Sequence, residues 1–417
     1  MAAALAAAIA GAPPRGLDKA FLDAAVADAR EALAAVYSAI ASDALGGGVR
    51  VRRYSLSTRL GAVTVNYPYA PGRGGFAKVR ALLDAGGAGE AKATAASRDL
   101  LSGACALLGS FAEAASYAAL AGGVAVSAGT ARKICLAEAA KVERALDAGT
   151  AARAPQPRRP LPKGARAVPP TVAVFADGTG APCVRRDTRG VAGRNGGEAG
   201  TRELKVLAAV RYDHVDARGR PLVRPGDAIY RATAAGAADS GPMLRKMADE
   251  LAAGEVVRTQ FVSDGAAWAE NMHGTEFCDA ARTVDFYHAC QYLHEVVSAI
   301  APGENARQMY GAYRARMERQ GGAAVCECLL RNHGDKVNAP DFPAAKAFRY
   351  LVDRRDAMEY GHLRSQGLYI ASGIIESACK FIVGARCKQA GMHWRHQNAA
   401  AVANLRAALR SFRKLPA

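Results

Sequence analysis

The 417-residue chain lacks any apolar run that approaches the roughly 18 residues needed to cross a membrane as a helix. Its first residues, MAAALAAAIAGAPP, also lack the basic segment with which a signal peptide begins. Both absences argue against secretion and insertion into a bilayer. We therefore expect a protein that has no membrane partner.

The chain also lacks cysteines at the spacing of a metal site or a disulfide framework. Its nine cysteines are scattered in apolar surroundings, for example Cys135 between Ile134 and Leu136. The close pair Cys326 and Cys328 has neither a second pair nor a histidine at zinc spacing, so we interpret it as structural. This usage favours the reduced thiols of a cytoplasmic protein.

Acidic residues are the third deficit. Lys and Arg number 55 against 38 Asp and Glu, which gives a formal net charge of +17. An excess of this size indicates a polyanionic partner, most simply nucleic acid. The length allows two or three domains, each with its own core.

The N-terminal part begins with a predicted amphipathic helix over residues 17–45, which ends at a run of three glycines. A hairpin with its turn at Gly61 follows, because Val63, Val65 and Tyr67 alternate with polar residues. We expect the apolar stripe of the helix to be core; it consists of Leu22, Val26, Ala29, Leu33, Val36 and Ile40.

Residues 110–146 have the pattern of a helix-turn-helix. A short helix from Phe111 to Leu120 is followed by two glycines, and Ser127 can cap a second helix. This arrangement is typical of modules that dock in the DNA major groove. We therefore predict that residues 1–150 form a mostly α-helical DNA-binding domain, which exposes Thr130, Arg132 and Lys133 at the start of its second helix.

Residues 151–170 form a basic segment that prolines interrupt every few positions. Proline removes backbone donors and restricts its neighbours, so we expect neither helix nor sheet here. The segment is the clearest predicted domain boundary, and its basic side chains could follow a phosphate backbone.

Residues 171–417 alternate between strand and helix patterns. The predicted order is three strands, helix, strand, helix, strand, helix, with strands at 172–177, 204–212, 229–233, 256–264 and 283–287. This is the element order of the ribonuclease H-like α/β fold, in which the first and fourth strands lie side by side. A mostly helical insertion is expected at about residues 295–365.

Three carboxylates occupy positions suited to metal-dependent phosphoryl transfer. Asp177 and Asp264 each end an apolar strand and precede a glycine, and Glu376 lies in a helix that has no other acid. Oxygen ligands at strand ends suit Mg²⁺, and two such ions about 4 Å apart can promote in-line displacement at phosphorus. An ordinary Asp-Gly turn is the alternative for each aspartate taken singly.

Two further acids are weaker candidates. Asp285 ends the last strand, and His288 follows one helical turn later. Asp285 could be a fourth acid near the ions or an orienting group, although capping the next helix is the favoured role. Glu203, near the start of the second strand, is expected to pair with basic neighbours.

Basic residues near these acids are predicted to contact DNA. No Asp or Glu occurs from Ser377 to Ala417, which makes little sense for a solvated face. The predicted phosphate contacts are Lys380, Arg386, Lys388 and Arg395, together with Arg185, Arg186, Arg194 and Arg202 of a Gly-rich loop. A mobile hairpin tip is the alternative for that loop. Trp394 could stack on a flipped base, but we expect it in the core.

Several segments resemble a known family. DGTG with its basic loop, SDGAAW, TVDFYHACQYL and SGIIESACKFIVGARCKQAGMHW are similar to motifs of bacterial insertion-sequence transposases of the DDE type, in particular the ISKra group. The resemblance covers about residues 171–410. Relatives often carry cysteines after the hairpin region, whereas residues 46–100 contain none, so a zinc-stabilised module is not expected.

The resemblance implies a ribonuclease H-like core, Mg²⁺ or Mn²⁺ as two ions, and double-stranded DNA as partner, both transposon ends and target. The triad carried over is Asp177, Asp264 and Glu376. Such a transposase would act as a dimer or larger assembly. The alternatives are a domesticated DNA-binding protein without activity and a ribonuclease H-like nuclease that does not transfer strands.

Overall fold

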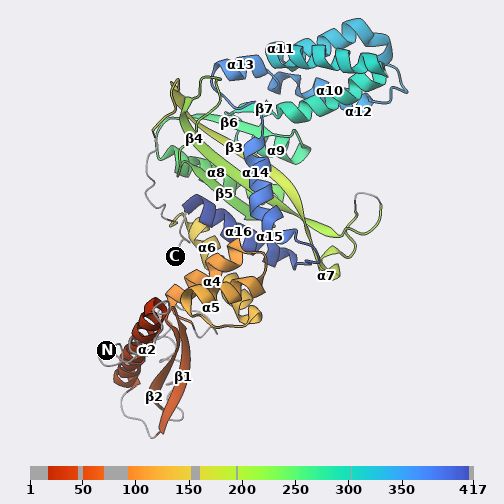
Figure 1. Ribbon diagram of the computed structural model, residues 1–417. Helices are drawn as coiled ribbons and strands as arrows, with labels where there is room; N and C mark the ends of the chain where they lie inside the picture. Colours follow the sequence, from red (N-terminus) through yellow and green to blue (C-terminus); the bar gives the residue numbers. More distant parts are fainter. Residues whose placement is uncertain are drawn as a thin grey trace. The chain divides into compact units, whose positions relative to one another are not determined.

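The computed structural model describes residues 17–45, 50–69, 93–151, 160–193, 196–301 and 303–412. The chain divides into two compact units, of which one ends at Leu146 and the other begins at Asp147 (Figure 1). This division falls just before the predicted linker. Residues 152–159 of that linker lie outside the described residues.

The first unit begins with α2 (Leu17–Leu45) and the antiparallel hairpin of β1 (Arg50–Thr58) and β2 (Gly61–Tyr69). The hairpin is confirmed, with Val63, Val65 and Tyr67 buried on one face.

The predicted stripe on α2 is wrong in its second half. Val36 and Ile40 are 54% and 42% exposed, while Ala41 is fully buried. The hairpin packs instead on the neighbouring face of the helix, against Tyr37 and Ala41. On that same face the Ser38 hydroxyl accepts a hydrogen bond from the backbone of Asn66 at 2.9 Å.

In the described part of the first unit, three helices follow the hairpin: α4 (Ala95–Leu107), α5 (Phe111–Gly122) and α6 (Ala128–Ala148). Gly123 ends α5 in the left-handed conformation, with φ at 62°. The Ser127 hydroxyl accepts from the Thr130 backbone at 3.2 Å and caps α6. The two predicted helices and the turn between them are therefore present, and α4 was not predicted.

The second unit is built on a mixed five-stranded sheet in the order β5-β4-β3-β6-β7. β4 runs antiparallel to β3 and β5, whereas β3, β6 and β7 are parallel. The first and fourth strands of this unit are adjacent, as predicted. The strands are β3 (Arg166–Pro182), β4 (Thr201–Val215), β5 (Ala228–Thr233), β6 (Arg258–Ser263) and β7 (Ala281–Val284).

The strand predictions fail mainly at their ends. β3 does not end at Asp177, as expected, but continues to Pro182 and stays paired with β4 up to that residue. β3 begins at Arg166, inside the segment expected to be irregular, and its pairing with β4 shifts register between Ala167 and Thr171. Pro169 and Pro170 occupy this irregularity, where a missing backbone donor is tolerated. Val256 is fully exposed and precedes β6, and β7 stops at Val284 because α10 already begins at Phe286.

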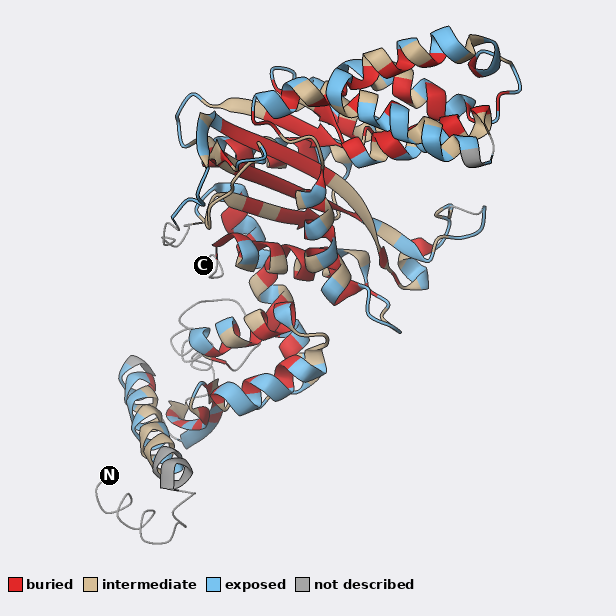
Figure 2. Ribbon diagram, turned by 45° about the horizontal axis from the view of Figure 1, so that its top comes forward, coloured by how far each residue is buried: buried red, intermediate tan, exposed pale blue. Residues whose placement is uncertain are grey.

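The sheet is buried between helices on its two faces (Figure 2). On one face Val172, Val174 and Ala176 of β3 pack against α8 (Ala237–Ala252) and α9 (Ala267–Glu276). Alternate residues of a strand point to opposite faces, so Phe175 and Asp177 point the other way. That second face is covered by Tyr369, whose ring meets Phe175 edge-on at 5.2 Å, and by α14 (Gly373–Ala378).

A helical insertion with its own core follows β7, which confirms the helical character predicted for 295–365. Its buried residues include Leu293, Met317, Leu329 and Leu351. Its helices are α10 (Phe286–Ile300), α11 (Glu304–Val337), α12 (Ala345–Arg354) and α13 (Tyr360–Ser365). α11 bends at Gly321, which has φ of 86° and ψ of 177°.

The chain returns to the sheet through α14, a π-helical turn η3 (Cys379–Gly384), α15 (Ala385–Cys387) and α16 (His396–Phe412). α16 lies along the edge strand β5. The Tyr230 backbone donates to the Ser411 hydroxyl at 2.8 Å, and the Ala232 backbone donates to Asn404 at 3.3 Å. These side chains satisfy donors that an edge strand otherwise leaves open.

No helix among the described residues is long and apolar enough to cross a membrane. All nine cysteines are described, and none of them forms a disulfide.

Candidate active site

The register of three neighbouring strands places three aspartates in one row. The parallel pairing of β3 with β6 ends at Phe175 and Val262, and Asp177 and Asp264 each lie two residues further on. Adjacent strands lie about 4.8 Å apart, and equal offsets keep both side chains at one level on one face. Ser263 pairs with Val284, so Asp285 continues the row on β7.

Asp177 is held at both carboxylate oxygens. Oδ1 accepts from the Gly178 backbone at 2.6 Å, and Oδ2 accepts from the Cys379 thiol at 3.5 Å. Burial raises the pKa of Asp177 above its ordinary value, and the negative charge of Asp264 adds to the rise. The two carboxylates thus lie near enough to repel each other, which is the electrostatic condition that a bound cation relieves.

Asp264 is positioned through its main chain. Its side chain accepts from the Ala266 backbone at 2.9 Å, and its carbonyl oxygen accepts from the Tyr350 hydroxyl at 2.5 Å. The next carbonyl, of Gly265, accepts from Arg354 at 2.9 Å. Gly265 has φ of 77°, and a Cβ there would lie 2.8 Å from the Tyr350 oxygen, so only glycine fits under this clamp.

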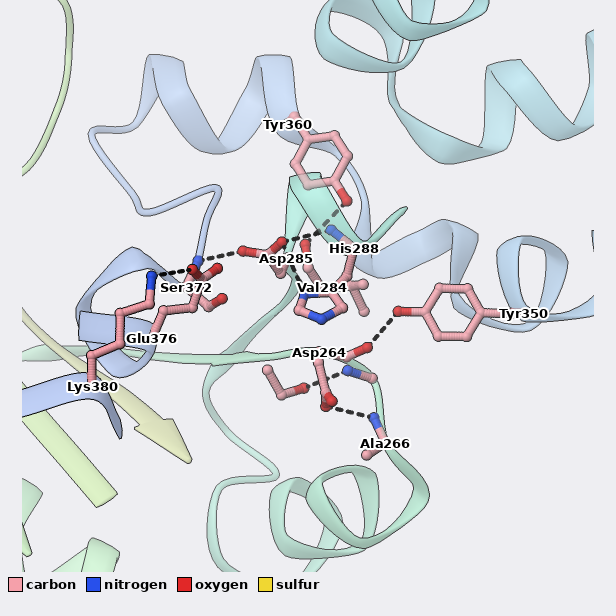
Figure 3. Close-up of polar contacts among 12 residues, drawn as sticks. Asp264, Ala266, Val284, Asp285, His288, Tyr350, Tyr360, Ser372, Glu376 and Lys380 are labelled. Atoms are coloured by element: carbon pink, nitrogen blue, oxygen red, sulfur yellow. Dashed lines mark hydrogen bonds and ion pairs between the residues drawn. The ribbon is translucent and has the colours of Figure 1, made fainter. Parts of the chain in front are cut away.

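Asp285 is fully buried and caps α10, which was its favoured predicted role. It accepts from the His288 backbone at 2.7 Å, from the His288 ring at 3.3 Å and from the Ser372 backbone at 2.5 Å (Figure 3). Burial alone would raise the pKa of Asp285, but the hydrogen bonds from His288 and Ser372 bring it below its usual range. Its carboxylate is therefore committed to orienting His288 and the start of α14.

His288 faces the same acidic centre. The hydrogen bond to Asp285 raises the pKa of His288 against the opposing effect of burial, and the charges of Asp264 and Glu376 raise it further. The imidazole is thus influenced by the acids of β6 and α14 at once. This agrees with a location at their common edge.

Glu376 is less constrained than the aspartates. It lies in the first turn of α14 with 43% of its side chain exposed, and Lys380 approaches it at 3.9 Å. The π-helical turn η3 begins three residues later. Such turns occur frequently at functional sites, because the extra residue widens the helix and redirects side chains.

The donor set fits a hard divalent cation in chemistry but is not gathered around one point. Among the residues that the structure describes, no group of three His, Cys, Asp or Glu side chains could hold a metal ion. Asp177, Asp264 and Glu376 nevertheless offer only carboxylate oxygens, which Mg²⁺ and Mn²⁺ prefer. The repulsion between Asp177 and Asp264 supports the fit, and Glu376 is the acid with freedom to approach.

Some of the predicted DNA contacts are accessible. The side chain of Lys380 is 81% exposed and that of Arg185 is 84% exposed, and Arg186 is also exposed. Lys388 is exposed and donates to the Thr179 hydroxyl in the DGTG segment at 2.6 Å. Arg194 lies outside the described residues.

The prediction for Arg386 is wrong, because this side chain is completely buried and cannot reach DNA. Its guanidinium lies 5.0 Å from the centre of the Trp394 ring. Trp394 is itself buried and donates to the Cys387 carbonyl at 3.1 Å, as expected of a core residue.

Two further predicted contacts have structural partners. Arg202 donates to the Asp187 carbonyl at 2.9 Å, and Arg395 pairs with the Asp187 carboxylate at 3.0 Å. Glu203 pairs with Lys205 at 2.8 Å, as expected. These bonds leave fewer guanidinium donors of Arg202 and Arg395 for hydrogen bonds to a phosphate.

In the first unit, Arg132 and Lys133 are exposed in the first turns of α6. Thr130 is half-buried, and its hydroxyl lies 3.1 Å from that of Ser127. The two basic residues thus have the exposure that a DNA contact requires.

Two residues of this site were not predicted. Tyr350 acts across 86 residues and Cys379 across 202 residues, so no local pattern marks either partner. Cys379 stands three residues after Glu376, and a single apolar-looking cysteine in a helix carries no signal of its own.

No protein-family model matches the chain, and no curated protein sequence shows significant similarity.

Proposed function

We propose that this chain is a DNA transposase of the DDE type, with a ribonuclease H-like catalytic unit and an N-terminal unit that recognises the ends of its element through a helix-turn-helix. The observation that carries the proposal is the parallel register of β3 and β6, which brings Asp177 and Asp264 to one level on one face. The helix that carries Glu376 covers that same face of the sheet.

The sheet order supports the proposal. Three antiparallel strands followed by two parallel ones, with the first and fourth adjacent, agree with a ribonuclease H-like core. The insertion lies in the chain between the row of strand-end aspartates and Glu376. The basic excess and the exposed Lys380, Lys388 and Arg185 suit a substrate with a phosphate backbone.

Asp177, Asp264 and Glu376 would hold two Mg²⁺ or Mn²⁺ ions. When bound, such ions supply Lewis-acid stabilisation for the negative charge on the attacking and leaving oxygens. The chain's own residues do the positioning: Lys380 and Lys388 hold phosphates beside the acids, and Asp285 orients His288 at their edge.

The proposed reaction has two displacements at phosphorus. Water first attacks the phosphodiester at the element end, which forms a new P–O bond and breaks the bond to the 3′ oxygen, leaving a 3′-hydroxyl. That hydroxyl then attacks a target phosphodiester, so that one P–O bond forms and another breaks. Because two ends must be held together, we propose a dimer or larger assembly that works on DNA in a bacterial cytoplasm.

The test uses the purified full chain, Mg²⁺ and a labelled duplex carrying the terminal repeat of the element, in wild type and Asp264→Asn. We expect metal-dependent nicking at the end and joined products with the wild type alone. Nicking without joined products would indicate a nuclease instead. Salt-sensitive binding without cleavage by either protein would indicate a DNA-binding protein without this activity.

A further inference from the structure

The helical insertion carries an open cleft of about 760 Å³ that is separate from the acidic centre. It runs along one face of the first arm of α11, before the bend at Gly321, and is closed on one side by the second arm. Its polar lining includes Asn305, Gln308, Arg316, Arg319, Asn332 and His333.

The described lining of this cleft contains no acidic residue. Three acids of the same helix are directed elsewhere: Glu318 pairs with Arg364 at 2.8 Å, and Glu327 and Asp335 do not line the cleft. Two arginines and four side-chain amides, those of Asn305, Gln308, Gln320 and Asn332, therefore face one open space. Such a set donates hydrogen bonds to anions and to base edges and does not repel negative charge.

The length of the cleft favours a polymer over a small anion. From Asn305 to Gln320 the helix advances about 22 Å at 1.5 Å per residue, which spans several successive phosphates of one DNA strand. Arg316 and Arg319 lie one turn apart within this length. Asn305 and Gln308 precede them on the same arm, and Gln320 follows them.

The insertion is also fixed to the strands that carry the acids. The Tyr350 hydroxyl donates to the Asp264 carbonyl, and the Tyr360 hydroxyl donates to the Val284 carbonyl at 3.0 Å (Figure 3). A DNA strand bound in the cleft would therefore keep a defined position relative to the ends of the β-strands β6 and β7. A polyanion bound elsewhere on the surface would not be connected to Asp264 and Val284 through the hydrogen bonds of Tyr350 and Tyr360.

We propose that the cleft binds the phosphate backbone of the DNA substrate at a distance from the strand-cleaving acids, with Arg316 and Arg319 as its phosphate contacts. This inference rests on the proposed function for the choice of DNA. It assigns the insertion a role in holding the duplex, in addition to its grip on Asp264.

The test measures the affinity of the full chain for a fluorescent end duplex, without Mg²⁺, over a range of NaCl concentrations. Arg316→Gln/Arg319→Gln is compared with Arg307→Gln/Arg331→Gln, which removes two exposed arginines of α11 that do not line the cleft. We expect the first pair to weaken binding about tenfold near 0.1 M salt and to lower the slope of log K against log salt by about 2. The control pair should leave the slope unchanged.

A second variant guards against misfolding. Gln308 is exposed, so Gln308→Glu adds a carboxylate to the cleft without disturbing a buried group, and it should weaken binding at an unchanged melting temperature. Equal losses in both arginine pairs, or no loss in the first pair, would overturn the proposal. So would poly-L-glutamate binding that depends on Arg316 and Arg319 while DNA affinity does not, since the cleft would then take an acidic protein segment.

The two proposals can fail separately. A wild type that binds DNA but never cleaves the end duplex would refute the transposase, while a specific effect of Arg316 and Arg319 on duplex binding would still uphold the cleft. A protein that cleaves and joins the end duplex, but whose affinity for DNA does not change when Arg316 and Arg319 are replaced, would uphold the transposase and refute the cleft.

Discussion

The acids at the strand ends and the acid on the helix are held in contrasting ways. Asp264 is fixed by hydrogen bonds to its side chain and its carbonyl, and Asp285 accepts three hydrogen bonds and is fully buried. Glu376 is 43% exposed and meets Lys380 at 3.9 Å. A sheet edge can thus supply rigid ligands, while the final ligand comes from an element with more freedom.

The three proposed ligands form no group that could hold a metal ion as they stand in the described part of the chain. The parallel pairing of β3 and β6 ends two residues before Asp177 and Asp264, and the negative charge of Asp264 adds to the rise in the pKa of Asp177. Glu376 precedes a π-helical turn, in which a small change of winding rotates the residues before it. The helix is therefore the part of the site that we expect to move when the site is filled.

The largest expected effect comes from changing the reach of each carboxylate by one CH₂. Asp264→Glu should lower end cleavage by about 10²-fold, because its rigid setting cannot absorb a displacement near 1 Å. Glu376→Asp should lose only about tenfold, because α14 can adjust. Single-turnover cleavage of the end duplex measures both, with Asp264→Asn and Glu376→Gln as fully inactive controls. Equal losses in the two conservative variants would abolish the contrast.

A smaller effect is expected from the clamp on Asp264. Tyr350→Phe keeps the stacking on Tyr292, at 3.8 Å between ring centres, and removes only the hydroxyl that holds the Asp264 carbonyl. We expect Mn²⁺ affinity to fall by about 10- to 100-fold, as for other groups that orient metal ligands. Electron paramagnetic resonance of Mn²⁺ titrations measures this without cleavage.

Tyr360→Phe is the matched control for the clamp. It removes a similar hydroxyl bond, to the Val284 carbonyl on the neighbouring strand, and should cost similar stability, about 1 kcal/mol. Its Mn²⁺ affinity should remain that of the wild type. If both variants lose affinity alike, the clamp contributes general rigidity and does not specifically position Asp264.

Removal of the Cys379 thiol, which links Asp177 to the helical segment that carries Glu376, should have a modest effect. Cys379 follows Glu376 on the same helical segment and donates to Asp177, so Cys379→Ala frees Asp177 Oδ2. We expect a rise of about threefold to tenfold in the Mg²⁺ concentration for half-maximal cleavage, the equivalent of one net hydrogen bond. Cys379→Ser keeps a donor and should restore the wild-type value; a serine variant as impaired as alanine would point to packing instead.

The smallest effect concerns stability in metal-free buffer. The folded-state pKa of Asp177 is raised, so its ionised form destabilises the fold above the ordinary pKa near 3.8, and this deficit disappears as the pH falls towards that value. Asp177→Asn should therefore melt at a higher temperature than wild type at pH 7 in EDTA, with the gain shrinking towards pH 4.

Asp285→Asn should behave in the opposite way, which makes it the control. The folded-state pKa of Asp285 is lowered, so its charge stabilises the fold above its ordinary pKa and that contribution is lost in acid. The variant should melt lower than wild type at pH 7, and the gap should narrow as the pH falls. If Asp177→Asn and Asp285→Asn both melt at a lower temperature than wild type at pH 7, the effect of the buried charge on stability does not differ between these two aspartates.

Much of the sheet could be predicted from sequence because its signals are local. The apolar runs before Asp177 and Asp264 mark the buried parts of β3 and β6, and the order of elements led to the expected adjacency of those strands. The Asp-Gly pair marks the end of β6 only, because β3 continues beyond it to Pro182. The ends of strands were less predictable. Pro169 and Pro170 argue against a strand in general, but a bulge beside a long hairpin accommodates them.

What the sequence could not show depends on distant partners. A basic residue such as Arg386 resembles a DNA contact until Trp394 and the surrounding core are seen to enclose it. Val36 and Ile40 of α2 are exposed because the hairpin packs against the adjacent face of the helix. Both faces are apolar enough to pack, so the sequence alone does not show which one is buried. The clamp of Tyr350 on Asp264 joins residues whose spacing follows no period.

The way in which α16 completes the edge of the sheet has a consequence for biosynthesis. Ser411 and Asn404 occupy backbone donors of β5 that were translated some 170 to 180 residues earlier. Until those residues leave the ribosome, the nascent sheet presents an unprotected margin to other chains. Ribosome pausing before α16 is translated, or truncation of the chain before α16, would therefore leave the edge of β5 uncovered. The incomplete protein would then be prone to aggregation, whatever the state of its acidic site.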